Sequence, residues 1–307
     1  MRNAFTRVTL LAVLGALLFA PFATGAQEQG ASVTTVVTVL GPKFTPPPQF
    51  TKADIAVTEG KNKDVVTNLV AAQGDKAKLE LAIIVDEAND SSFANQMGDL
   101  RNFINGLPPT TGVGVFYANN GTVQALSQFT TDHAAAAKTI RLTLGRMGAY
   151  SSIYLSTMDL IKRWPDNGGR REILLIADGI DRFRGDPFSP DVQSTVDTAQ
   201  KAGIMIHTLY NSGTGRYARN MFRVNYGQSN LAQLTDGTGG ESFFQGLQTP
   251  LSYAPYLQQL DTILKNQYYL SFAAAPAKNA KGELRNIRVR SVEKDLDISA
   301  PDRVWVK

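Results

Sequence analysis

Two aspartates stand where apolar segments of the chain stop, and their carboxylates are of the type that binds hard cations. Asp86 ends the run "LELAIIVD", and Asp178 directly follows "REILLIA". Continuous apolar runs of this length are typical of parallel strands that are buried on both faces. The carboxyl ends of parallel strands meet at one edge of a sheet, so we expect the two carboxylates to lie near each other. Oxygen ligands of this kind suit Mg²⁺ or Ca²⁺.

The segments around these aspartates alternate between strand-like and helix-like patterns. Alternation at this rhythm predicts an α/β fold with a doubly wound, Rossmann-like and mainly parallel sheet. We expect strands over residues 79–86, 111–119, 121–129, 171–177 and 204–210, and helices over residues 91–107, 131–147, 151–164, 189–203 and 254–267, with a short helix after residue 228.

The chain divides into four segments by composition. Residues 1–26 carry Arg2 and Arg7, an apolar stretch and a small-residue site at Thr24-Gly25-Ala26, which predict a cleavable signal peptide. Residues 32–78 are rich in alternating Val and Thr and form an N-terminal β element. The α/β domain covers residues 79–266, and we expect the C-terminal β-strands of residues 267–307 to pack with the N-terminal element.

The composition excludes several classes of function. The 307 residues include 31 basic and 27 acidic side chains, a balance that does not favour nucleic acid as a partner. Cysteine is absent and histidine occurs twice, which argues against disulfides, zinc sites and a lipid-anchored cysteine. Nucleophile-elbow and phosphate-loop motifs are absent as well. We therefore expect a non-enzymatic protein, secreted or periplasmic, without a transmembrane segment after signal removal.

Three motifs in order, "IIVDEANDSS", "GAYSSIYLSTMDLI" and "LLIADG", resemble those of the von Willebrand factor A (VWA) domain. The flanking "FTKADIAVTEGKNKDVV", "LDTILKNQYYLSFAAAP" and "LRNIRVRS" resemble the secreted, acidobacterial-type VWA-related family, so the resemblance covers almost the whole mature chain. It implies a metal-ion-dependent adhesion site, in which an Asp-x-Ser-x-Ser motif, a Thr and a second Asp hold Mg²⁺.

This sequence departs from the pattern of that site. Asp86 and Asp178 match the two aspartates, whereas Ala88 and Asp90 replace the two serines and Ser151 falls at the threonine position. Ala88 offers no ligand oxygen, so we expect a degenerate site and no bound cofactor. The alternative is an altered acidic site of Asp86, Asp90, Ser151 and Asp178 that holds Mg²⁺ or Ca²⁺. A third reading gives the aspartates only turn and capping roles.

The segment of residues 211–228 interleaves arginines with aromatic side chains after the strand of residues 204–210. Residue types of this kind are enriched at protein interfaces. The alternative is an ordinary loop folded over the domain. The candidate partner-binding residues are Arg216, Tyr217, Arg219, Phe222 and Arg223.

Together these observations predict a secreted VWA-like protein that mediates protein–protein interaction or adhesion at the carboxyl edge of its sheet. Two other functions stay open at this point. One is a divalent-metal-dependent hydrolase built on the carboxylates Asp86, Asp90 and Asp178, and the other is a structural module of an envelope assembly.

Overall fold

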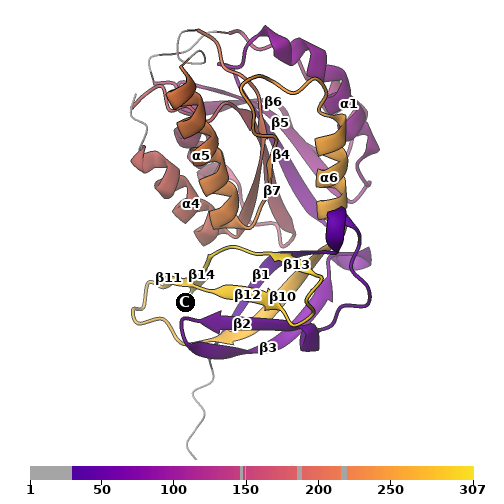
Figure 1. Ribbon diagram of the computed structural model, residues 1–307, viewed down its shortest axis with the longest axis vertical. Helices are drawn as coiled ribbons and strands as arrows, with labels where there is room; N and C mark the ends of the chain where they lie inside the picture. Colours follow the sequence, from indigo (N-terminus) through magenta and orange to yellow (C-terminus); the bar gives the residue numbers. More distant parts are fainter. Residues whose placement is uncertain (1–29, 146–147, 149, 185–188, 216–219) are drawn as a thin grey trace, which may run out of the picture.

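The computed structural model describes residues 30–145, 148, 150–184, 189–215 and 220–307. The signal-peptide prediction lies outside these residues. Figure 1 shows an α/β domain stacked on a β-sandwich. Both chain crossings between the two lie at the amino ends of the α/β strands, so the carboxyl ends face away from the sandwich. Within the described residues no helix has the length and apolar character needed to cross a membrane.

The α/β domain is built on a six-stranded sheet whose order is β6-β5-β4-β7-β8-β9. Within the domain this is the order 3-2-1-4-5-6, which is that of a doubly wound fold. Only the edge strand β6 runs antiparallel to its neighbour. The strand order confirms the predicted fold class. The strands are β4 (Leu79–Asp86), β5 (Thr111–Asn119), β6 (Thr122–Thr130), β7 (Arg170–Ala177), β8 (Ile204–Tyr210) and β9 (Ser242–Phe243).

Helices cover both faces of this sheet because the central strands are apolar on both sides. In β4, Leu81, Ile83 and Val85 face one core, while Ala82 and Ile84 face the other. The first core is covered by α1 (Met97–Gly106), α2 (His133–Lys138) and α6 (Ala254–Lys265). The second is covered by α3 (Ile153–Arg163), α4 (Pro190–Ala202) and α5 (Met221–Thr238).

The β-sandwich joins the two ends of the described chain. Its large sheet has the order β12-β2-β3-β10-β1-β13, and its small sheet pairs β11 with β14. Strand β1 lies antiparallel to β10, which follows the α/β domain in sequence. The strands are β1 (Ala31–Leu40), β2 (Ile55–Glu59), β3 (Asn62–Ala71), β10 (Gln267–Ala274), β11 (Glu283–Asn286), β12 (Arg288–Ser291), β13 (Asp297–Ser299) and β14 (Arg303–Val306). Short 3₁₀ turns lie at Pro42–Phe44 (η1), Lys52–Asp54 (η2), Gly74–Lys76 (η3) and Ser91–Gln96 (η4).

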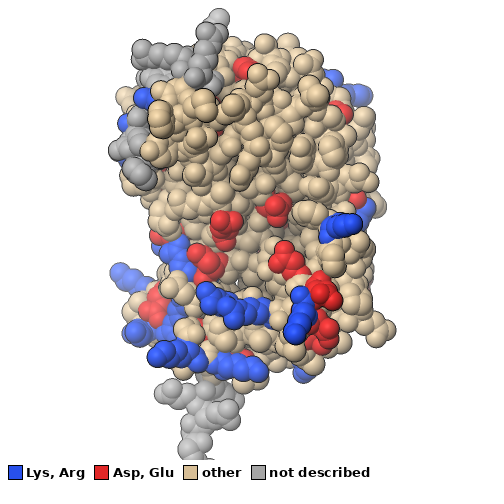
Figure 2. Space-filling view, viewed as in Figure 1, with Lys and Arg blue, Asp and Glu red and all other residues tan. Residues whose placement is uncertain are grey.

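Charged side chains are distributed unevenly over the two parts. Figure 2 shows that, on the face it presents, Lys, Arg, Asp and Glu gather over the β-sandwich and the waist between the two parts. The same face of the α/β domain is covered mostly by other residue types. Solvent-exposed surface that is poor in charge is a feature of protein-binding regions rather than of a uniformly solvated domain.

Two helix predictions were wrong in extent. The helix expected over residues 131–147 ends at Lys138. Its continuation is instead held by hydrogen bonds that compete with helix formation, since Tyr117 Oη accepts from the Arg141 amide at 2.9 Å and Glu87 accepts from the Leu144 amide at 2.7 Å. Conversely, the short helix expected after residue 228 is longer, because α5 begins at Met221 with Asn220 as its N-cap.

Candidate functional site

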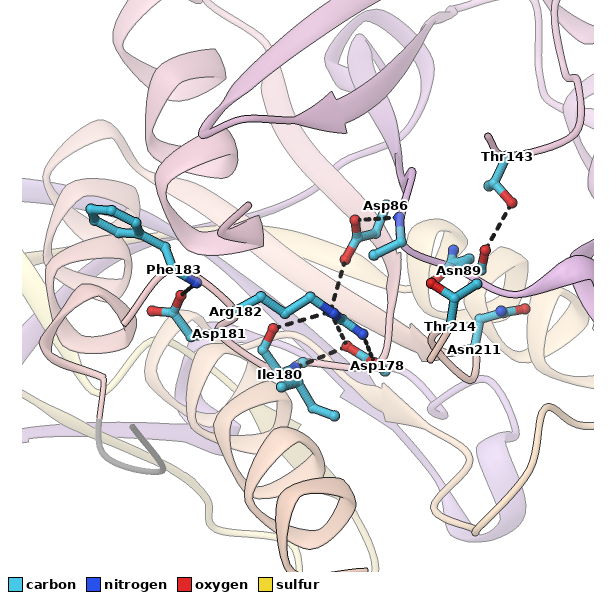
Figure 3. A network of polar contacts seen from close by, with 12 residues as sticks. Asp86, Asn89, Thr143, Asp178, Ile180, Asp181, Arg182, Phe183, Asn211 and Thr214 are labelled. Carbon is cyan, nitrogen blue, oxygen red and sulfur yellow. Dashed lines mark hydrogen bonds and ion pairs between the residues drawn. The ribbon is translucent and has the colours of Figure 1, made fainter. Parts of the chain in front are cut away.

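Asp86 and Asp178 do lie at the same edge of the sheet, and a third residue joins them. The side chain of Arg182 extends between the two carboxylates, as Figure 3 shows. All three side chains are buried, and that of Arg182 is 4% exposed. Sequence reasoning predicted the positions of the two aspartates but missed the arginine.

Arg182 is anchored on Asp178 and is only an electrostatic neighbour of Asp86. Its Nη1 donates to Asp178 Oδ1 at 3.0 Å, and its Nη2 donates to Asp178 Oδ2 in a second, parallel hydrogen bond. The same Nη1 lies 3.9 Å from Asp86 Oδ2, which is an ion-pair distance but too long for a hydrogen bond. The bidentate geometry with Asp178 is the strong, directional form of an arginine–carboxylate contact.

Each aspartate also stabilises the turn that follows its strand. Asp86 Oδ1 accepts from the amide of Ala88 at 2.9 Å, and Asp178 Oδ1 accepts from the amide of Ile180 at 3.0 Å. Side chains of Asp commonly hold turns in this way. Both carboxylates therefore have a structural role in addition to their contact with Arg182.

The pKa values of these groups follow from burial and from the unequal contacts. Burial raises the pKa of Asp86 to about 6, Arg182 lowers it only in part, and Asp178 raises it further. Burial alone would lower the pKa of Arg182, but the carboxylates of Asp178 and Asp86 raise it above its ordinary value. The guanidinium is thus a permanent cation, and Asp86 is the group of the cluster that can change its charge near pH 6.

Backbone contacts bring the loops after β4, β7 and β8 together around Arg182. Asn89 forms an isolated antiparallel bridge with Gly213, and the Thr214 amide donates to Ala88 O at 2.8 Å. A Cβ atom at Gly213 would collide with Asp178 Oδ2 and Arg182 Nη2. A side chain at residue 213 would therefore require Asp178 or Arg182 to shift from its place in the ion cluster.

The remaining expected metal ligands, Asp90 and Ser151, make other contacts. Asp90 is the N-cap of η4, where its carboxylate accepts from the Ser92 amide at 2.9 Å. Ser151 is buried, and its amide closes a turn with Gly148 O at 3.2 Å. Within the described ranges no group of three or more His, Asp or Glu side chains is arranged to hold a metal ion. The residues present do not fit the Mg²⁺ site that the resemblance implies, because Ala88 has no oxygen and the Arg182 guanidinium lies between the two aspartates.

A signal for Arg182 was present in the sequence. Two buried carboxylates need a counter-charge, and the loss of ligand oxygen at Ala88 argues against a metal as that charge. Arg182 and Arg184 are the arginines in the loop directly after Asp178. Arg184 instead pairs with Asp191 at 3.2 Å and is half exposed. The choice between them depends on the loop conformation, which the sequence pattern does not specify.

We use the name rim for the described residues of the loops at the carboxyl ends of the α/β strands, together with the first two turns of α5. These loop residues are 87–96, 140–145, 148, 150–152, 178–184, 189, 211–215, 220 and 244–253. Among the described residues, all exposed large hydrophobic side chains except Val65 and Val292 lie on the rim. These rim side chains are Leu142, Leu144, Tyr150, Phe183, Met221, Phe222, Tyr226, Leu247 and Leu251.

The rim also contains a groove and a pair of aromatic rings. The groove has a volume of about 550 Å³ and lies between Asp90, Thr143, Leu144, Thr214 and Leu247. Its size is within the usual range of ligand pockets. On the other side of the ion cluster, the rings of Tyr150 and Phe183 pack at 5.4 Å between centroids.

Of the predicted partner-binding residues, Arg216, Tyr217 and Arg219 lie outside the described residues. Phe222 and Arg223 lie in the first turn of α5 rather than in a loop. The side chain of Phe222 is 76% exposed. The prediction for Phe222 therefore stays open with a changed structural context, as an exposed ring at the start of a helix.

The sheet order, the antiparallel edge strand and the paired aspartates at the carboxyl edge define the α/β part as a VWA-type fold. No family model matches the chain, and no curated protein matches it. The acidobacterial-type subfamily stays a prediction.

Solved structures similar to the chain include three proteins with little sequence identity. An aerotolerance-related membrane protein from Bacteroides fragilis, carrying multiple mutations to serine, is 13% identical with a TM-score of 0.45, over 61% of this chain and 98% of that one. A von Willebrand factor type A protein from Catenulispora acidiphila is 9% identical with a TM-score of 0.42, over 92% of this chain and 74% of that one. The vWF domain of the type V pili tip protein Mfa5 from Porphyromonas gingivalis is 11% identical with a TM-score of 0.42, over 61% of this chain and 94% of that one.

Proposed function

We propose that this protein is a non-enzymatic interaction or adhesion module that binds a protein partner through the rim of its VWA-type domain without a metal ion. The observation that carries the proposal is the concentration of exposed large hydrophobic side chains on the rim. Exposed apolar side chains that gather in one region mark an interaction site more than ones scattered singly. On the rim, Tyr150 packs against Phe183, and Leu144 and Leu247 line one groove.

The position of the rim supports this assignment. The β-sandwich lies at the opposite end of the α/β sheet, so it leaves the rim accessible to another molecule (Figure 1). Exposed Tyr150 and Phe222 supply the aromatic surface that contributes most binding free energy at protein interfaces. The groove beside Leu144 and Leu247 offers a concave complement to an inserted side chain.

A metal-bridged mode of adhesion is disfavoured by the geometry of the ion cluster. Such a mode needs a metal that accepts a carboxylate from the partner, and here a buried guanidinium lies between Asp86 and Asp178. The metal-dependent hydrolase reading is disfavoured for the same reason, since Asp90 caps η4 instead of joining the other two carboxylates. We therefore regard the metal-ion-dependent adhesion site as degenerate.

The test uses rim variants beside exposed hydrophobic residues of the β-sandwich as matched controls. Tagged mature protein is crosslinked in the extracytoplasmic fraction of its source cells, in the presence of EDTA. We expect Tyr150→Ser and Phe222→Ser to lose the captured partner, while Val65→Ser and Val292→Ser retain it. Capture that is equal in all four variants would contradict a rim interface, and capture abolished by EDTA would contradict metal independence.

We also propose that the mature protein is secreted or periplasmic after cleavage behind Ala26. The support is the signal-like pattern of residues 1–26. N-terminal sequencing of the protein from its source cells should begin at Gln27. Recovery of the intact N-terminus from the cytoplasm would contradict this location.

A further inference from the structure

We propose that Arg182 is a built-in cation that takes the place of the divalent metal and holds the rim loops in one arrangement. This inference deepens one part of the proposed function, the degenerate metal site, and it does not depend on whether the rim binds a partner. It rests on the contacts of a residue that the VWA resemblance did not point to.

The first feature that supports this role is the charge of the cluster. Two buried carboxylates in close proximity repel each other and require a counter-charge. Arg182 supplies it through two hydrogen bonds to Asp178 and an ion pair of 3.9 Å with Asp86. A guanidinium cannot lose its proton at ordinary pH, so this counter-charge is present under all conditions in which the protein folds.

The second feature is the space that the Arg182 guanidinium occupies. The guanidinium fills the volume between the two carboxylates and is 4% exposed. Gly213 closes over it without room for a Cβ atom, and the bridge between Asn89 and Gly213 fixes that closure. A metal ion could therefore reach Asp86 and Asp178 only if Arg182 left.

The third feature is that Arg182 and its neighbours belong to several of the rim loops. Arg182 belongs to the loop after β7, its partners terminate β4 and β7, and the covering residue Gly213 follows β8. Three rim loops are thus tied to a single side chain of this chain. A metal site can gain and lose its ion, whereas a covalently attached cation cannot dissociate, so the rim should be insensitive to metal concentration.

The test compares the wild type with Arg182→Ala, Arg182→Met and Arg182→Lys by thermal unfolding at pH 7.5, with Mg²⁺ or with EDTA. We expect the wild type to melt at the same temperature in both. Arg182→Met should melt roughly 10 °C lower, because the carboxylates lose their counter-charge while the space stays filled. Arg182→Lys should recover part of this loss, since it keeps the charge.

Arg182→Ala removes both the charge and the volume of the side chain, so its comparison with Arg182→Met separates the two effects. It should be destabilised, and Mg²⁺ should raise its melting temperature because the vacated space lies between two carboxylates, whereas Arg182→Met should not respond to Mg²⁺. Arg184→Ala, in the same loop, is the matched control and should behave as the wild type does.

Three results would overturn the inference. The first is a wild type that EDTA destabilises, which requires no variant to fold. The second is Arg182→Met as stable as the wild type, and the third is Arg182→Lys no more stable than Arg182→Met. A failure of partner capture at the rim would leave all three measurements unchanged, so this inference and the proposed function can fail separately.

Discussion

Two buried clusters of arginine and carboxylate lie at opposite ends of the α/β sheet, and they differ in the hydrogen-bond donors that reach the carboxylates. At the rim, Asp86 accepts a hydrogen bond from the Ala88 amide and forms an ion pair of 3.9 Å with Arg182. At the amino end, under the β-sandwich, Glu172 Oε2 accepts from His207 Nε2 at 2.9 Å and from Gln267 Nε2 at 3.1 Å. Arg170 also lies 3.7 Å from Glu172 Oε1.

The difference appears in the pKa values of the two carboxyl groups. Burial alone would raise the pKa of Glu172, yet the hydrogen bond from His207, with Arg170 and Gln267, lowers it. Burial raises the pKa of Asp86 to about 6, and Arg182 only partly opposes this. Equal burial is therefore accompanied by opposite shifts. The donors His207 and Gln267 lower the pKa of Glu172, whereas the neighbouring carboxylate of Asp178 adds to the effect of burial at Asp86.

The amino-end cluster also holds the two parts of the protein together. Gln267 is the first residue of β10 in the sandwich, whereas Glu172 and His207 lie in β7 and β8. His207 Nδ1 accepts from the Glu241 amide at 3.0 Å, so its Nε2 carries the proton that is donated to Glu172. Glu172 thus accepts two side-chain hydrogen bonds through Oε2, although its Oε1 is buried without a hydrogen-bond partner among the described residues, whereas Asp86 accepts a hydrogen bond from the Ala88 amide.

The largest expected effect of a substitution is at the amino end. Glu172→Ala should lower the free energy of unfolding by about 3–5 kcal/mol, because Arg170 is left buried without its carboxylate. Urea unfolding at pH 7.5 measures this. Asp261→Ala, which breaks the exposed pair with Lys265, is the control and should cost about 0.5 kcal/mol or less. Equal losses of unfolding free energy in the two variants would show that the buried and the exposed ion pair contribute equally to stability, which would contradict this expectation.

The second effect is a pH dependence that differs in sign between the clusters. The pKa of Asp86 is raised from 3.8 to about 6, so its contribution to stability is fully present below pH 3.8 and is lost as the pH rises through 6. The expected change is on the order of 3 kcal/mol. The pKa of Glu172 is lowered, so its contribution is present above its ordinary pKa of 4.5 and is lost as the pH falls through its folded-state value.

Urea unfolding of the wild type and Asp86→Asn between pH 4 and pH 7 separates these contributions. The variant cannot ionise at residue 86, so the difference in stability between the two proteins should change over this range and level off above pH 6. A difference that is constant with pH would show that Asp86 is ionised throughout, and it would contradict the comparison of the two clusters.

The third effect concerns the glycine that covers Arg182. Gly213→Ala should cost about 1–3 kcal/mol, because the added Cβ would collide with Arg182 and Asp178. Gly98→Ala in α1 is the matched control, since its Cβ would meet open space and helical alanine stabilises by about 0.5–1 kcal/mol. Chemical denaturation measures both. A neutral Gly213→Ala would mean that the loop after β8 is not closed over the cluster.

The smallest effect on stability is expected at the rim surface. Phe222→Ser should change the free energy of unfolding by no more than about 0.5 kcal/mol, because the ring is 76% exposed and packs little. Partner capture should fall in the same variant. A large loss of stability would show that the Phe222 ring contributes to the packing of the fold, which would argue against a role in partner binding.

The sequence predicted the α/β sheet and the location of its aspartates for physical reasons that act locally. Apolar runs such as residues 79–86 indicate buried strands, and the end of each run places its Asp at one edge. The role of Arg182 could not be predicted in this way, because it depends on how an irregular loop folds back over β4. The early end of α2 could not be predicted for the same reason. Glu87 accepts a hydrogen bond from the Leu144 amide, which lies 57 positions away in the sequence.

The most direct test of the central claim, that Arg182 takes the place of the metal, is a crystal structure of the wild-type protein soaked in Mn²⁺, with anomalous difference density. We expect no Mn²⁺ peak between Asp86 and Asp178, and a guanidinium hydrogen-bonded to Asp178 at that position. A Mn²⁺ peak at bonding distance from both carboxylates, with Arg182 displaced toward solvent, would contradict it.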